Sequence, residues 1–335
     1  MAAPKENFLR LMKNDNPKWL GDPWSCFCGN PVTLDAVWPS TKQPGEGEMQ
    51  VKDAFGVVKN RPVTPNGGRT GGTPDTSGDK KLVKDIAHWK DFVIFPDLSG
   101  LDWTGPEKSC AEADRENFLL MAGTYMGMFE YSHYVMGFED ALVNYLTEPD
   151  HMFDLLSAYT DWKIKCAELI IDHMKPDILH SHDDWGNKQN LFLPPEVWRE
   201  TLKPQYKKFY GYVKSRGVMV QHHNDSVSDL LIEDMTDLGI DMWQGPIAQN
   251  DIKGCMEKAA GRICLMGGFD MQKIDFYPAD EKKIREEVRR VIDTYVPLGN
   301  FIPCVPNIVP IYPDVEKIIN DELNKYGAEY AAKHF

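Results

Sequence analysis

Several features that would identify a class of protein directly are missing from this sequence. Its 335 residues contain no run of eighteen apolar residues, which argues against a transmembrane helix. No Gly-x-Gly-x-x-Gly segment precedes a helical pattern, and no Gly-x-x-x-x-Gly-Lys-Ser/Thr motif occurs, so nothing indicates a nucleotide cofactor. The charged N-terminal stretch lacks the apolar segment of a secretory signal. Basic residues are outnumbered by acidic ones, 37 to 51, and the net charge of −14 disfavours nucleic acids and anionic membranes as partners.

Cysteine is sparse as well. The seven cysteines have no dense or regular spacing, which indicates reduced thiols and a cytoplasmic location. Cys26 and Cys28 resemble half of a thiolate metal site, but no second pair of similar spacing follows, which favours ordinary reduced thiols. With 42% hydrophobic and 26% charged residues, the chain can bury a large core and remain soluble.

The chain divides into an irregular portion and a regular one. Residues 1–90 follow no clear period, and residues 60–81, rich in Gly, Pro and polar side chains, are predicted to form a surface loop or a lid over a pocket. Beyond them, short apolar runs alternate with amphipathic helical stretches. The apolar runs are 92–98, 118–129, 177–185, 217–226, 239–245, 262–270 and 300–307.

Three of the helical stretches have recognisable ends. One begins near Thr147-Glu148-Pro149-Asp150, a second extends from Pro194 to Gly217, and a third begins around Pro278 and ends by Gly299. Seven or eight strands alternating with helices indicate parallel βα units. We therefore predict an α/β fold in which residues 1–335 form one (β/α)8 TIM-barrel domain with an irregular N-terminal extension.

Polar and metal-binding residue types follow the apolar runs repeatedly. In a β/α barrel the carboxyl ends of the strands form the active-site face, so these residues are expected to meet there. They are His182, Asp183, Asp184, His222, His223, Asp225, Trp243, Gln244, Asp270, Gln272 and Cys304.

A zinc site can be built from part of this set. His222, Asp225 and Cys304 supply nitrogen, oxygen and sulfur donors, and three protein ligands leave one position open for catalysis. His223 competes with His222, because alternate residues of a strand point to opposite sides and only one of the two should face the barrel interior. The sequence does not decide between them, and either histidine could instead only bond neighbouring loops.

The two adjacent carboxylates of Asp183 and Asp184 are candidates for chemistry. One of them could act as a base, bind a substrate group or hold a ligand histidine in place. The structural alternative is that one caps the next helix. We expect Asp184 to be the functional one of the pair.

The segment DDWGNKQNLFLPPEVWRETLKPQYKKFYGYVKSRGVMV resembles the central signature of the uroporphyrinogen decarboxylase superfamily. That signature has an Asp-Asp-x-Gly turn, a Pro-Glu helix start, a Lys-Pro pair and a strand that ends in His. Further similar segments run through nearly the whole chain in order. These are DAFGVV (53–58), FPDLSGLDW (95–103), GIDMWQGPIAQNDI (239–252), GGFDMQ (267–272) and IPCVPN (302–307).

Within the superfamily, the sequence is more similar to corrinoid-dependent methyltransferases than to haem-pathway decarboxylases. The decarboxylases carry an Arg-Gln-Ala-Gly-Arg motif that meets substrate carboxylates, whereas the corresponding region here reads GDPWSCFCGNP. The methyltransferases hold zinc by a His-x-Cys pair and a later Cys. His222 and Cys304 match two of these ligands, but Asn224 stands in place of the first Cys, so Asp225 or His223 must substitute.

The resemblance implies a zinc-dependent methyltransferase of the O-demethylase type. It would move a methyl group from a small, methoxylated aromatic donor to a corrinoid on a partner protein, since the chain lacks a corrinoid-binding Asp-x-His-x-x-Gly motif. Asp184 or His182 would position the substrate or handle a proton. An aromatic wall and polar contacts to the substrate would come from Tyr125, Asp183, Trp185, Trp243, Gln244, Asp270 and Gln272.

Two other functions fit the same sequence. One is a metal-free decarboxylase of a small or tetrapyrrole-like acid, with an acid such as Asp184 protonating the product. The other is a protein that only binds a corrinoid or tetrapyrrole. The superfamily resemblance is also compatible with a homodimer.

Overall fold

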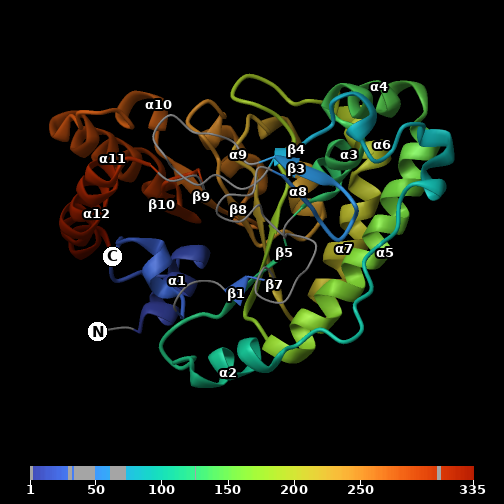
Figure 1. Cartoon of the computed structure of the whole chain (residues 1–335). Coiled ribbons are helices and arrows are strands. Elements are labelled where there is room, and N and C mark those ends of the chain that lie inside the picture. Colours follow the sequence, from blue (N-terminus) through green and yellow to red (C-terminus); the bar gives the residue numbers. More distant parts are fainter. Residues whose placement is uncertain (1–2, 29–31, 34–49, 61–72, 125, 308–310) are drawn as a thin grey trace.

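Parallel strands dominate the structure, a computed structural model that describes residues 3–28, 32–33, 50–60, 73–124, 126–307 and 311–335 (Figure 1). One parallel sheet contains seven of the described strands, in the order β1-β5-β6-β7-β8-β9-β10. Each strand lies beside the next one along the chain, which is the order of a (β/α)8 barrel, as predicted. The strands are β1 (Val32–Thr33), β5 (Met121–Thr124), β6 (Ile178–His182), β7 (Met219–His223), β8 (Met242–Gln244), β9 (Cys264–Gly268) and β10 (Phe301–Cys304).

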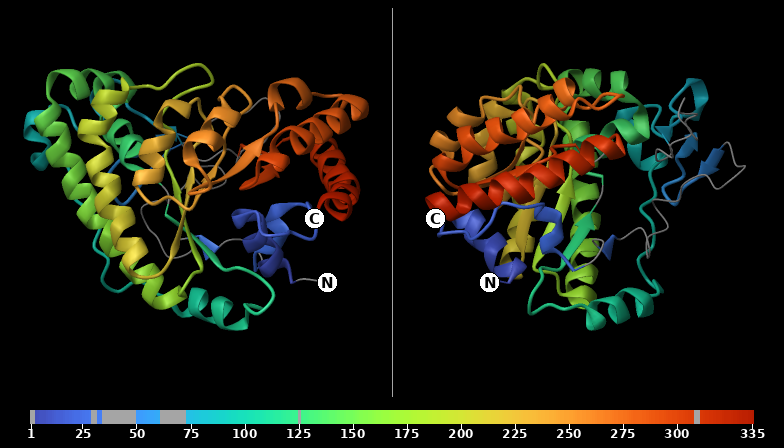
Figure 2. Two further views of the ribbon diagram at one scale, coloured as in Figure 1. Left: turned by 180° about the vertical axis from the view of Figure 1, so that it is seen from behind. Right: turned by 90° about the vertical axis from the view of Figure 1, so that its left-hand side faces the viewer.

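Helices connect the strands and cover the outside of the sheet (Figures 1 and 2). The long helix α5 contacts α7 and β5, and α11 packs against both α12 and β10. None of the described helices is both long and apolar enough to cross a membrane. The helices are α1 (Pro4–Lys13), α2 (Thr104–Glu112), α3 (Met128–Met136), α4 (Phe138–Thr147), α5 (Pro149–Met174), α6 (Pro195–Thr201), α7 (Lys203–Ser215), α8 (Ile232–Asp237), α9 (Ile252–Ala259), α10 (Met271–Ile274), α11 (Glu281–Tyr295) and α12 (Pro313–His334), with 3-10 turns η1 (Pro23–Cys26), η4 (Gly78–Lys80), η5 (Ile86–Asp91), η6 (Asp229–Leu231) and η7 (Val296–Leu298).

The N-terminal segment packs beside the last strand. Helix α1 and turn η1 contact β10, and the Asn300 side-chain amide donates a hydrogen bond to the Met12 carbonyl at 2.7 Å. Among the described residues, no ladder joins β10 to β1. The start of the chain therefore lies against one edge of the parallel sheet.

Six of the seven apolar runs contain strands, and the first does not. Residues 92–98 were expected to form a strand but follow η5 without any ladder. Pro96 has no amide proton to donate to a sheet, and its carbonyl accepts a hydrogen bond from Trp162 Nε1 at 2.9 Å. Phe95 of this run packs on Tyr159 and Trp162 of α5, and the extra strand of the sheet is β1 instead.

Two of the three predicted helices form as expected. Helix α5 begins at Pro149, and α11 follows Asp280, whose carboxylate accepts from the Lys283 amide at 3.2 Å. The helix predicted between Pro194 and Gly217 is divided into α6 and α7. Pro204 explains the break, because proline lacks the amide proton that would continue the helix.

A small antiparallel sheet lies between β1 and β5 in the sequence. It consists of β2 (Gln50–Lys52), β3 (Val58–Asn60) and β4 (Thr73–Pro74), in that order. The buried Asp53 accepts a hydrogen bond from the Tyr134 hydroxyl on α3, which fastens this sheet near the end of β5. Residues 61–72, the middle of the predicted loop or lid, lie outside the described residues.

Candidate metal centre

Three side chains from the carboxyl ends of β6 and β7 come together. His182 is the last residue of β6, Asp184 lies two residues beyond it, and His223 ends β7. Each offers one ligand atom, and these atoms all lie within 4.8 Å of one another. The rings of His182 and His223 stack with centroids 4.6 Å apart. Two imidazoles and a carboxylate at this spacing form a candidate metal centre.

Strand register explains why these histidines are neighbours. His182 pairs with His223 in the β6–β7 ladder, and His223 pairs with Gln244 in the β7–β8 ladder. Paired residues of parallel strands point to the same side of a sheet. His182, His223 and Gln244 therefore form a row across the ends of three strands.

Glu130 on α3 fixes the orientation of the His182 ring. Nδ1 of His182 donates to the Glu130 carboxylate at 3.0 Å, so Nε2 is the nitrogen that would bind a metal ion. Burial opposes the charge of His182, but the Glu130 carboxylate, with Asp184 and Asp183, outweighs burial and raises the pKa of His182 to about 9. A carboxylate behind a ligand histidine is a common arrangement at zinc sites, because it orients the ring and makes it a stronger donor.

Gln244 fixes the ring of His223 in the same way. Its side-chain nitrogen donates to the Pro306 carbonyl at 3.0 Å, so its oxygen must be the atom that faces His223 and accepts from Nδ1. Nε2 of His223 therefore carries the lone pair. This atom is buried and has no hydrogen-bond partner among the residues that the structure describes. Burial also holds the pKa of His223 well below its usual range, so the ring is the neutral form that binds metals.

Asp184 supplies the oxygen donor of the group. Its Oδ1 accepts a hydrogen bond from the Asp225 amide at 2.9 Å. Burial raises the pKa of Asp184 to about 7, and the charges of Glu130 and Asp225 add to this effect against the opposing charge of His182. A bound cation would favour the ionised carboxylate in this crowded acidic site. Two features fit a zinc ion: the unpartnered Nε2 of His223, and a donor set of two nitrogens and one oxygen.

Asp183 points away from this group and holds helix α3. Its carboxylate accepts from the amides of Phe129 and Glu130 at 3.0 and 2.8 Å, from Trp185 Nε1 at 3.1 Å, and from the Tyr206 hydroxyl. A Cβ at Gly127 would lie 2.1 Å from the Asp183 side chain, so glycine permits the close approach. Asp183 thus caps α3, a helix that precedes it in the chain, whereas the structural alternative considered for Asp183 or Asp184 was a cap on the next helix.

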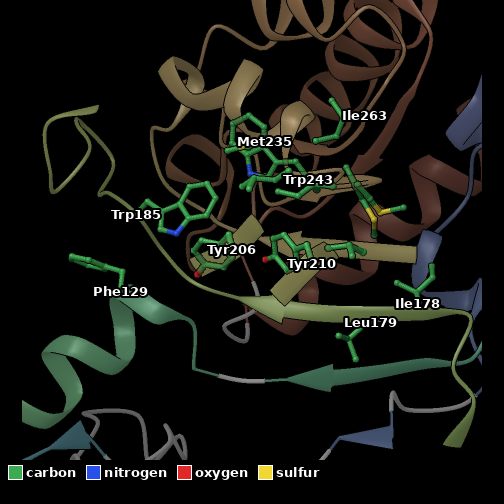
Figure 3. Packing of buried hydrophobic residues seen from close by; sticks show 14 of the residues in the cluster. Phe129, Ile178, Leu179, Trp185, Tyr206, Tyr210, Met235, Trp243 and Ile263 are labelled. Carbon is green, nitrogen blue, oxygen red and sulfur yellow. The ribbon is translucent and has the colours of Figure 1, made fainter. Parts of the chain in front are cut away.

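His222 faces the helices rather than the row of His182, His223 and Gln244. Its ring stacks on Trp185 at 4.2 Å, and its Nδ1 lies 2.7 Å from the Tyr210 hydroxyl. Figure 3 shows Trp185, Tyr206 and Tyr210 close together beside β6. Nε2 of His222 is also unpartnered among the described residues, but His222 belongs to no group of three or more His, Cys, Asp or Glu ligand atoms in that part of the chain.

The other predicted ligands lie outside the candidate metal centre. Asp225 contributes its amide to Asp184, and its carboxylate accepts from Asn307 Nδ2 at 2.7 Å. Cys304 is buried and its thiol donates to the Val305 carbonyl at 3.2 Å, while burial raises its pKa well above the usual value. The sequence-based set of His222, Asp225 and Cys304 is therefore not brought together as a metal group.

Asn224, which replaces a family cysteine, has a structural role. Its oxygen accepts from the Ser226 amide and hydroxyl, and its nitrogen donates to the Ser228 hydroxyl at 2.9 Å. Its carbonyl accepts from Trp243 Nε1 at 2.9 Å. Asn224 and Trp243 therefore shape the loop after β7, and both polar atoms of the Asn224 side chain are already used.

The remaining predicted site residues are dispersed. Asp270 is buried at the end of β9, with one oxygen 2.7 Å from Lys273 Nζ and the other unpartnered among the described residues. Gln272 accepts from the Gln249 amide at 3.4 Å on the exposed rim. Tyr125 lies outside the described residues. Their predicted contacts with substrate stay predictions.

Glu130 is the site residue that sequence reasoning missed. It lies in residues 123–137, a stretch rich in Met and Tyr, which is a composition typical of buried core. Glu130 follows Gly127 by three residues, and its carboxylate accepts a hydrogen bond from the Gly127 amide, which is a pattern typical of a helix start. Nothing in the local sequence connects Glu130 with His182, which lies 52 residues later. Only the barrel brings β5 and β6 side by side.

We expect Glu130 to set metal affinity through His182. Glu130→Ala should weaken zinc binding roughly 10- to 100-fold, the range seen when the partner of a ligand histidine is removed. Glu130→Gln should lose less, because its side-chain oxygen can still accept from Nδ1. Competition with a chromophoric chelator measures both, and equal affinities for wild type and Glu130→Ala would contradict this role.

The family match and one of two similar structures agree with the barrel. The family model described as Uroporphyrinogen decarboxylase (URO-D) matches residues 110–302. A methyltransferase from Methanosarcina mazei has a similar structure, with a TM-score of 0.64 over 98% of this chain and 99% of its own, at 14% sequence identity. A D-psicose 3-epimerase structure has a TM-score of 0.35 over 69% of this chain and 82% of its own, at 8% sequence identity. No curated protein sequence matches.

Proposed function

The chain belongs to the uroporphyrinogen decarboxylase family, and from this premise we propose that it is a zinc-dependent methyltransferase. It moves a methyl group from a small methoxylated aromatic donor to a corrinoid carried by a partner protein. The observation that carries the proposal is the group of His182, Asp184 and His223. Both rings of this group are oriented by polar partners, and the group lies at the end of the barrel where such folds place catalysis.

The donor set favours an ether as substrate. It contains two nitrogens and one oxygen and no sulfur. A thiolate would donate more charge to the metal than these ligands do, so their zinc ion would be a stronger Lewis acid. Zinc bound here would supply that acidity to the oxygen of the methoxy group. This set replaces the sequence-based ligands His222, Asp225 and Cys304 in our proposal.

Residues of the chain orient the proposed metal ligands. Glu130 and Gln244 each hold an Nδ1 proton, which directs both Nε2 atoms to the metal position. The Asp225 amide holds the Asp184 carboxylate in place.

The region GDPWSCFCGNP contains no arginine, so the chain lacks there the cationic partners that a tetracarboxylate substrate requires.

A methyl-transfer assay tests the proposal. Zinc-loaded protein is mixed with a panel of methoxylated benzoates and a reduced cob(I)alamin or corrinoid protein, and the methylated corrinoid is followed by its visible absorbance. We expect transfer that falls roughly 1,000-fold after complete chelation, equivalent to about 4 kcal/mol of transition-state stabilisation, and that returns with zinc. No transfer with any donor in the zinc-loaded protein would contradict the proposal.

One observation favours a second candidate, a metal-free decarboxylase. Burial raises the pKa of Asp184 to about 7, so this residue holds a proton near neutrality and could deliver it to a carbanion-like product. Decarboxylation of a small acid that persists after chelation would support this function instead.

A further inference from the structure

The loop after β10 contacts two residues, Gln244 and Asp225, that each orient one ligand of the candidate metal centre. Its residues Val305, Pro306 and Asn307 follow the last described strand. The Gln244 side-chain nitrogen donates to the Pro306 carbonyl at 3.0 Å and approaches the Val305 carbonyl at 3.5 Å. Asn307 Nδ2 donates to Asp225 Oδ2 at 2.7 Å. No feature of the sequence pattern had suggested a role for Asn307.

The first of these residues, Gln244, connects the loop with His223. The carbonyls of the loop hold the nitrogen of Gln244, and this fixes the Gln244 oxygen toward His223 Nδ1. Gln244 and His223 are both fully buried, so neither can exchange this partner for water without opening the site. The position of the loop therefore determines which way the His223 lone pair points.

The second of these residues, Asp225, connects the loop with Asp184. Asn307 holds the Asp225 carboxylate by its side-chain amide, while the Asp225 amide donates to Asp184 Oδ1 at 2.9 Å. Without the Asn307 amide, the Asp225 carboxylate would be free to turn, and the backbone that presents its amide to Asp184 would lose a restraint. Asn307 thus acts on Asp184 through one intervening residue.

We infer that the loop 305–307 positions the metal ligands, and that Asn307 is a positioning residue that sets metal affinity through Asp225. The inference rests on the metal centre of the proposed function. It assigns Asp225 a place behind Asp184 rather than on the metal. It also makes the strand β10 a part of the site through its loop, although the Cys304 thiol takes no part.

The test compares zinc and cobalt binding in variants of the full chain. Asn307→Ala should weaken zinc binding roughly 10-fold and shift the visible absorption bands of the cobalt-substituted protein. The exchange Asp225→Asn with Asn307→Asp reverses donor and acceptor and keeps the charge, so it should recover affinity to within about 3-fold of wild type. Asn300→Gly removes an amide at the other end of β10 at a residue with φ +48°, and should leave affinity unchanged.

Each outcome separates the positioning role from other roles. Unchanged zinc affinity and cobalt spectrum in Asn307→Ala would overturn the inference alone. An Asp225→Asn variant that loses zinc, with no recovery in the exchanged pair, would show that Asp225 is itself a ligand and would also overturn it. Zinc binding that depends on Asn307 without any methyl transfer would defeat the proposed function and leave the inference standing. Wild-type protein that binds no zinc or cobalt would overturn both.

Discussion

His223→Ala is expected to abolish tight zinc binding, whereas His222→Ala should retain about one zinc per chain. The two residues are adjacent in β7 and equally buried, but only His223 groups with His182 and Asp184. Its Nε2 is a buried acceptor without a partner, and its tautomer is fixed by Gln244. Removing one of three protein ligands should weaken zinc binding by at least about 100-fold. Equilibrium dialysis followed by plasma mass spectrometry measures the bound metal.

The His222→Ala variant is the matched control, because it removes the same ring from the neighbouring position. It takes away the stacking contact with Trp185 and the bond to Tyr210, so it is expected to lower stability but not metal content. Circular dichroism of both variants verifies the fold. Zinc loss in His222→Ala with retention in His223→Ala would reverse our assignment.

Asp183→Ala is expected to destabilise the metal-free protein by about 3–5 kcal/mol. The Asp183 carboxylate accepts from two backbone amides of α3, from Trp185 Nε1 and from the Tyr206 hydroxyl. Three of these hydrogen bonds are buried and the one from the Glu130 amide is partly buried, and alanine would remove the acceptor from all four donors. Urea unfolding followed by circular dichroism gives the change in the free energy of unfolding.

The neighbouring Asp184→Ala variant provides the comparison for Asp183. Asp184 has a raised pKa of about 7, mainly because of burial, so its charge is unfavourable in the metal-free fold. Its removal should change the stability of the metal-free protein by less than about 1 kcal/mol and abolish tight zinc binding. A small stability loss in Asp183→Ala together with a large rise in substrate KM would instead support the predicted substrate contact.

Sequence alone named His182, Asp184 and His223 among its candidates but did not group the three as metal ligands. Alternating apolar runs and helices gave the barrel, and the barrel rule placed His182, Asp184 and His223 at one face. The choice between His222 and His223 depends on the phase of β7. Val220 shares a face with His222, while Gln221 shares the other face with His223. Both faces of a parallel barrel strand are buried, so polarity alone does not show which is inside.

The contacts that orient the ligands were out of reach for a different reason. Glu130 and His182 lie 52 residues apart, and Asn307 and Asp225 lie 82 residues apart. No periodicity or motif relates such positions, and only the strand order of the barrel brings them together. The run 92–98 failed as a strand for a local reason, since Pro96 cannot donate to a sheet.

X-ray absorption of zinc bound to the wild-type protein tests the metal centre most directly. The protein is purified without chelator or nickel, its metal content is measured, and the zinc edge and fine structure are recorded. We predict about one zinc per chain, surrounded only by nitrogen and oxygen at about 2.0–2.2 Å, with the imidazole scattering of two histidines. A sulfur shell at about 2.3 Å would place Cys304 or another thiolate on the metal and contradict the assignment of His182, Asp184 and His223.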